Sequence, residues 1–358
     1  MRIIGCDLHA RQQTIAMLDT ETGELVEKIL EHEGEKVREF YAHLPRPVLV
    51  GIEATGSMPW FLKLLEELKM DCQVGHPAKI RKAETRKQKH DRRDARLLLK
   101  LLAENRFPSI WMPSTEQRDL RTLLRHRHQW VRMRTRVQNT LQAMALSNGL
   151  RRGHSLWSPA GRQALEALPL APYAHQRRAA LLTLYPRLQE SIDHLDQQVG
   201  EQAWQRPQAR RLMTHPGVGP VTALATEVFL GDPLRFVDGK AVASYIGIIP
   251  SEHSSGERQR LGALSKQGNA LVRYLWCEAA MHAVRHDPEL KRFYKRKLVQ
   301  KGVGKARIAA ARKLGIRLWI MLRDRIDYEE FCRRGQSRQK SGEARTGMSG
   351  YDTGPAAP

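Results

Sequence analysis

Short apolar runs alternate with amphipathic stretches over the first hundred residues of the chain. The runs have the length and flanking turns of buried strands, and the stretches between them have apolar side chains at helical spacing. Strands are expected over residues 3–7, 13–18, 24–29, 47–52 and 72–74, and helices over 35–44, from about 59, and from about 91. The predicted order is therefore β-β-β-α-β-α-β-α, the pattern of a mixed α/β domain.

From residue 113 the pattern becomes helical. A loose apolar stripe ends at Asn148-Gly149, and a second stripe covers residues 173–204. The stripes consist of Leu120, Leu124, Val131, Leu141 and Met144, and of Leu181, Leu184, Leu188, Ile192 and Leu195. They predict an antiparallel helical pair, with a dimerising coiled coil as an open extension. The arginine-rich face of the first helix either contacts nucleic acid or is simply solvated.

A third region from about residue 206 is predicted to be mainly helical. The glycine-rich turn at 214–221 resembles that of a helix-hairpin-helix, although such turns are as often mere connections. A short helix at 236–245, a polar loop at 251–262 and an apolar helix at 271–284 follow. The expected domains are 1–110, 111–205 and 206–332, and the polar tail 333–358 is expected to be disordered.

Charge changes this picture most. The chain has 358 residues, with 60 Lys and Arg against 38 Asp and Glu, for a net charge of +22. The excess lies in three segments, 79–93, 118–136 and 285–325, and the rest is close to neutral. Three basic segments favour a long polyanionic partner such as nucleic acid over a single anionic pocket. A basic surface that merely aids solubility is the alternative.

Cysteine usage and hydropathy limit the location of the protein. The four cysteines are widely spaced and form no CxxC pair, which argues against a zinc site or a disulfide framework. The first apolar run is too short for a secretory signal, and no run is long enough to cross a bilayer. We expect a soluble, cytoplasmic protein.

Four acids are the candidate catalytic residues. Asp91 and Asp94 are three positions apart, so their side chains lie on one face of the predicted helix, as a surface ion-pair cluster would also place them. Asp7 and Glu53 each end a predicted buried strand. If the first and fourth strands are neighbours, all four carboxylates meet at one edge of the sheet.

Such a cluster predicts a divalent-metal site. Like charges near 4 Å repel by about 4 kcal/mol at an effective dielectric constant of 20, so cations are needed to neutralise them. Carboxylate oxygens suit Mg²⁺ or Mn²⁺, and two such ions would activate a phosphodiester. The arrangement is that of a ribonuclease H-like nuclease core. If the acids decorate unrelated loops instead, no metal dependence is expected.

Several motifs together resemble one family over residues 1 to about 330. They are Gly5-Cys-Asp7, Gly51-Ile-Glu53-Ala-Thr-Gly56, Asp91-x-x-Asp94-Ala, Pro216-Gly-Val-Gly219, Gly247-x-x-Pro250, Ser255-Gly256 and Lys266-x-Gly-Asn269. The sequence resembles the DEDD transposases of bacterial insertion sequences. These transposases act as bridge-RNA-guided recombinases and are relatives of the Piv DNA invertases. The resemblance implies a RuvC-like N-terminal domain and a C-terminal transposase domain.

The resemblance also implies roles. It makes Asp7, Glu53, Asp91 and Asp94 the metal-binding tetrad and Ser255 the nucleophile, with Ser254 beside it as the other choice. DNA strand exchange would then pass through a phosphoseryl intermediate, with Mg²⁺ or Mn²⁺ as cofactor. Expected partners are donor and target DNA, a guide RNA and further copies of the chain in a dimer or tetramer, in a nucleoid-associated complex.

Two other functions stay open at this point. A structure-specific nuclease of the Holliday-junction type would need the four acids and no serine. A non-catalytic RNA- or DNA-binding protein would need neither. Replacing Ser255 by Ala would leave the activity of such a nuclease intact but not that of a recombinase. Replacing Asp7 or Asp94 by Asn would leave the function of a non-catalytic binding protein unchanged.

Overall fold

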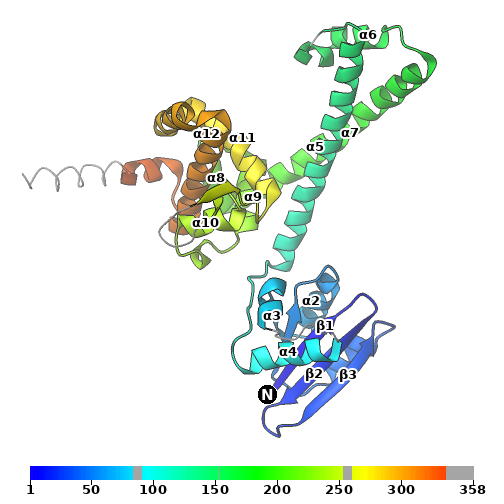
Figure 1. Cartoon of the computed structure of the whole chain (residues 1–358), viewed down its shortest axis with the longest axis vertical. Helices are drawn as coiled ribbons and strands as arrows, with labels where there is room; N and C mark the ends of the chain where they lie inside the picture. Colours follow the sequence, from blue (N-terminus) through cyan, green and yellow to red (C-terminus); the bar gives the residue numbers. More distant parts are fainter. Residues whose placement is uncertain (84–90, 152, 253–259, 336–358) are drawn as a thin grey trace, which may run out of the picture. The chain divides into compact units, whose positions relative to one another are not determined.

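A computed structural model of the chain describes residues 1–83, 91–151, 153–252 and 260–335. They form two compact units, one of residues 1–115 and one that begins at residue 116 (Figure 1). Ser254, Ser255 and the part of the predicted tail from residue 336 onward lie outside the described residues. Residues 328–335 are helical.

The first unit contains a five-stranded sheet with the strand order β3-β2-β1-β4-β5. Its strands are β1 (Arg2–Leu8), β2 (Gln12–Asp19), β3 (Leu25–Glu31), β4 (Val48–Glu53) and β5 (Asp71–Gly75). The first three strands are antiparallel, whereas β4 runs parallel to β1 and β5 parallel to β4. The first and fourth strands are therefore neighbours, which is the condition under which the four acids were expected to meet at one edge.

Each face of the sheet has its own apolar layer, because side chains alternate along a strand. Ile4, Cys6 and Leu8 of β1 pack with residues of α1 (Lys36–Ala42) and α2 (Met58–Glu67). On the other face, Ile3 packs with α4 (Asp91–Ala103), which lies across the sheet in Figure 1. The α4 residues in that layer are Ala95, Leu99 and Leu102.

One helix of the first unit was not predicted. No element was expected between the strand at 72–74 and the helix from about 91, but this segment contains α3 (Pro77–Ala83). Proline at the first position suits a helix start, because its missing N–H group has no intrahelical partner there. Ile80 is the buried residue of this helix, so seven residues give no apolar period that a sequence pattern could reveal.

The second unit begins with a pair of long helices, α5 (Thr115–Ser147) and α7 (Pro172–Gln205). Side-chain contacts show that the two run antiparallel. Arg127 pairs with Asp196, Arg134 with Gln189, and Gln138 with Tyr185. Residues later in α5 therefore contact residues earlier in α7. The predicted helical pair is thus present. The short elements η1 (Gly153–Trp157) and α6 (Pro159–Glu166) connect the two helices (Figure 1).

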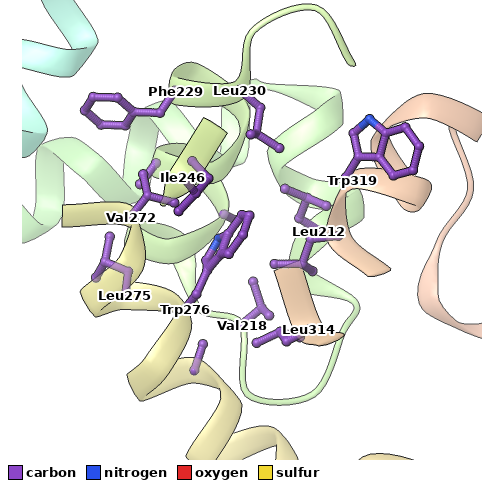
Figure 2. Packing of buried hydrophobic residues seen from close by; sticks show 14 of the residues in the cluster. Leu212, Val218, Phe229, Leu230, Ile246, Val272, Leu275, Trp276, Leu314 and Trp319 are labelled. Atoms are coloured by element: carbon purple, nitrogen blue, oxygen red, sulfur yellow. The ribbon is translucent and has the colours of Figure 1, made fainter. Parts of the chain in front are cut away.

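The rest of the second unit surrounds one large apolar core. Its elements are α8 (Pro207–Met213), α9 (Pro220–Leu230), η2 (Pro233–Arg235), α10 (Gly239–Ile246), β6 (Pro250–Glu252), β7 (Leu261–Leu264), α11 (Ala270–His286) and α12 (Pro288–Asp324). Figure 2 shows Trp276 at the centre, close to Val218 and Leu314. The Trp276 indole N–H donates a hydrogen bond of 2.9 Å to Thr226 Oγ1. Glycine is required at 315, since a Cβ there would lie 2.0 Å from the indole ring.

The fold class is confirmed at the level of a mixed α/β first unit followed by a mainly helical region. Within the described ranges, no helix is both long and apolar enough to span a membrane.

Candidate metal centre

The C-terminal ends of β1 and β4 place Asp7 and Glu53 side by side. The pairing of these parallel strands ends at Cys6 with Ile52, so the next residue of each strand is one of the two acids. Paired residues of neighbouring parallel strands point to the same face. Asp7 shares its face with Ile3 and Gly5, which contact α4, and both acids therefore lie on the face that α4 covers.

Two glycines let α4 approach this face closely. Gly5 and Gly51 are partners across β1 and β4, and each lies two residues before one of the acids. A Cβ at Gly5 would lie 2.2 Å from the carbonyl oxygen of Ala95, and one at Gly51 would lie 2.5 Å from Leu102 Cδ1. The absence of these two side chains brings the helix backbone directly onto the sheet beside the acids.

The first turn of α4 then brings a third carboxylate to Asp7. Ligand atoms of Asp7, His9 and Asp91 all lie within 4.8 Å of one another. The His9 Nε2 atom is 3.1 Å from Asp7 Oδ2 and 3.7 Å from Asp91 Oδ1. A strand end, the turn after it and a helix start thus meet at one point.

The electrostatics of Asp7 reflect this crowding. Burial raises the pKa of its carboxyl group, the neighbouring His9 opposes that change, and the carboxylates of Asp94 and Asp91 add to it. Asp94 is half-buried and close enough to repel Asp7. Glu53 is half-buried at the adjoining strand end, and neither Glu53 nor Asp94 belongs to the three-residue group at ligand distance in the described part of the chain.

His9 is the residue that sequence reasoning missed. Its position two residues after Asp7 was the available signal, because alternate residues at a strand end point to the same face. A histidine beside an acid in a turn is too common to stand out without knowledge of the helix that packs against it.

Comparisons with known proteins assign the chain to a family. A family model for DEDD transposases of the IS110 type, described as Transposase, matches residues 4–147. A second model, described as Transposase IS116/IS110/IS902 family, matches residues 209–295. A probable family 20 transposase of Pseudomonas aeruginosa is 31% identical over 257 residues, which are 70% of this chain and 75% of that protein. The chain belongs to the IS110 family of DEDD transposases.

Further relatives of this IS110-family transposase are also proteins of insertion sequences. The transposase for insertion sequence element IS1111A of Coxiella burnetii is 25% identical over 286 residues, or 76% of this chain and 77% of the relative. The transposase for IS1328 of Yersinia enterocolitica is 23% identical over 252 residues, or 68% and 73%. The resemblance stated from the motifs is confirmed, and the protein is a DNA-processing enzyme of an insertion sequence.

The residues at the sheet edge fit the divalent ion that DEDD transposases generally use. Carboxylate oxygens are the ligands of Mg²⁺ and Mn²⁺, and one imidazole nitrogen is compatible with Mn²⁺. Burial of Asp7 among other carboxylates leaves negative charge that a bound cation would offset.

Proposed function

We propose that this IS110-family transposase exchanges DNA strands at a divalent-metal centre formed by Asp7, Glu53, Asp91 and Asp94, with Ser255 as nucleophile. One observation carries the metal centre: two strand ends and one helix start bring acids far apart in the sequence to a single edge of the sheet. The adjacent first and fourth strands also support a RuvC-like, ribonuclease H-like assignment for this unit.

Each group has a distinct task in this proposal. The acids and His9 would supply the ligands of the metal ion. The register of β1 and β4 and the packing of α4 on the sheet support this assignment, because they fix the backbone positions of these residues. A bound Mg²⁺ or Mn²⁺ ion would polarise the scissile phosphodiester and stabilise developing negative charge on its oxygens.

The proposed covalent step conserves the phosphodiester bond. The Ser255 hydroxyl attacks phosphorus, the bond to the leaving deoxyribose oxygen breaks, and that oxygen takes up a proton. The hydroxyl of the other strand then attacks the phosphoserine and releases Ser255. Rejoining therefore needs no ATP. The serine lies in the segment between β6 and β7, within the range that the second family model matches.

Guide RNA is the proposed source of sequence choice. In such a system base pairing reads donor and target DNA, and the protein holds phosphate backbones. The net charge of +22 and its concentration in three segments support this division of labour. We further propose a dimer or tetramer in which Ser255 of one copy acts at the acids of another.

An adduct-trapping experiment tests the proposal. The full chain is incubated with Mg²⁺, an RNA transcribed from the element and DNA carrying its ends, and covalent DNA–protein adducts are mapped by mass spectrometry. Adduct attached to Ser255 is expected. Both Ser255→Ala and Asp7→Asn should lower adduct formation on the order of a thousandfold or more, because neither half of the centre acts alone.

Ser254→Ala is the matched control and should keep its adduct. DNA cleavage that persists in Ser255→Ala without adduct would favour the nuclease alternative. Equal activity of Asp7→Asn and the unchanged chain would overturn the metal centre.

A further inference from the structure

Helix α5 has two polar faces with different surroundings. One faces α7, where Arg127 is paired with Asp196 and Arg134 with Gln189. The other lines an open groove of about 970 Å³, which α7 completes with Arg177 and α11 with Tyr274. The α5 residues of the groove recur at helical spacing, so they form one continuous stripe along the helix.

The groove is cationic and contains no acid. Arg132, Arg136 and Arg177 line it with exposed side chains, and its other polar residues are neutral amides, hydroxyls and an imidazole. No carboxylate of the described residues forms an ion pair with these three arginines in the structure. Like charges held together without acids favour a polyanion as the occupant.

The shape of the groove favours a duplex. Its residues on α5 extend from His128 to Ser147, which at 1.5 Å per residue is about 30 Å. That length matches about nine base pairs at 3.4 Å per pair along each strand. Grooves for single strands combine cations with successive aromatic side chains. Here the aromatic residues are His128 and Tyr274, which pack together at one place with ring centroids 5.4 Å apart.

We propose that this groove binds the phosphodiester backbone of a nucleic-acid duplex. The three arginines would contact phosphates, and the side-chain amide of Asn139 would donate a hydrogen bond to a phosphate oxygen without reading bases. The inference rests on the proposed function, because it assigns one of the nucleic acids of that reaction to a defined surface of the second unit.

Equilibrium binding of the full chain as a function of salt tests the groove. The probes are a fluorescent 30-base-pair DNA duplex and an RNA duplex of the same sequence. In the variant Arg132→Ala/Arg136→Ala, the slope of log affinity against log salt should fall by about 2 on DNA, since about 0.9 counterion is released per phosphate contact. Affinity at 0.1 M salt should fall about tenfold or more.

The matched control is Arg187→Ala/Arg210→Ala, which removes two exposed helical arginines from the same unit, outside the groove. This control should change the salt slope by less than half as much as Arg132→Ala/Arg136→Ala does. The variant Arg132→Lys/Arg136→Lys keeps the charge and should restore the slope, which separates charge loss from misfolding.

The two probes identify the source of the duplex. If Arg132→Ala/Arg136→Ala loses affinity for both duplexes, the groove contacts a backbone feature that DNA and RNA share. If the variant loses affinity for one duplex alone, the groove is assigned to that nucleic acid. Slopes equal to those of the control variant on both probes overturn the proposal. The test is independent of strand exchange, because equilibrium binding of the probes involves no covalent step.

Discussion

In the part of the chain that the structure describes, each unit has one buried aspartate, and the environments of the two shift the carboxyl pKa in opposite directions. Asp7 is 9% exposed and Asp287 is 2% exposed. Burial raises the pKa of Asp7, and Asp94 and Asp91 raise it further although His9 opposes them. Burial also raises the pKa of Asp287, but the Leu290 N–H group and the Arg317 guanidinium outweigh it, so the pKa falls.

This difference matches a structural role for Asp287 and supports the ligand role that we propose for Asp7. Asp287 caps α12 by accepting a hydrogen bond of 2.8 Å from the Leu290 N–H group, and it is paired with Arg317. The fold therefore supplies its counter-charge. Among the described residues, the neighbours that shift the pKa of Asp7 are two carboxylates and one imidazole, so a bound cation would offset the negative charge there.

The largest effect is expected from neutralising each aspartate in turn. Asp287→Asn should lower the free energy of unfolding by about 3 kcal/mol, because it leaves the buried Arg317 short of a partner. Asp7→Asn should cost less than about 1 kcal/mol, since it removes a charge that its neighbours repel. Urea unfolding followed by circular dichroism, with hydrogen exchange to assign each unit, measures both values.

Repeating the unfolding measurements at low pH makes this test more specific. The stability that Asp287 contributes is present above the unfolded-state pKa of about 3.9 and is lost as the pH falls through its lowered folded-state pKa. Asp287→Asn should lack that loss. If Asp7→Asn destabilises the chain as much as Asp287→Asn, the fold already satisfies Asp7, and the comparison fails.

A smaller effect is expected from adding one methyl group at a glycine in each unit. Gly5→Ala should cost about 2 to 3 kcal/mol, because the new Cβ meets the backbone of α4. Gly200→Ala, within α7, has open space around its Cβ and should stabilise by about 0.5 to 1 kcal/mol. Thermal unfolding and hydrogen exchange of β1 and α4 measure the change. Equal signs for both substitutions would contradict the close packing that positions the acids.

The smallest effect concerns His9. If its Nε2 atom binds the cation, His9→Ala should weaken Mn²⁺ binding by about tenfold to a hundredfold, as measured by titration calorimetry of the full chain. His43→Ala, which changes an exposed histidine of the same unit, is the control and should leave binding unchanged. Unaltered affinity in His9→Ala would restrict the centre to carboxylates.

Much of the first unit could be predicted because its signals are local. Alternation of apolar and polar residues gave the strands, and helical spacing gave α4 with both of its aspartates on one face. The neighbouring positions of β1 and β4 were only a condition of the sequence argument, and the structure supplied them. Helix α3 was not predicted because a seven-residue helix with one buried side chain shows no helical periodicity of apolar residues.

The sequence by itself determined the order of strands and helices in the first unit apart from α3, the arginine-rich face of α5 and the family, because periodicity, charge and motifs are properties of neighbouring residues. Only the tertiary structure decided that Gly5 and Gly51 seat α4 on the sheet, that His9 joins Asp7 and Asp91, and that Asp287 has its own counter-charge. These outcomes depend on distances between residues far apart in the chain, which local patterns do not encode.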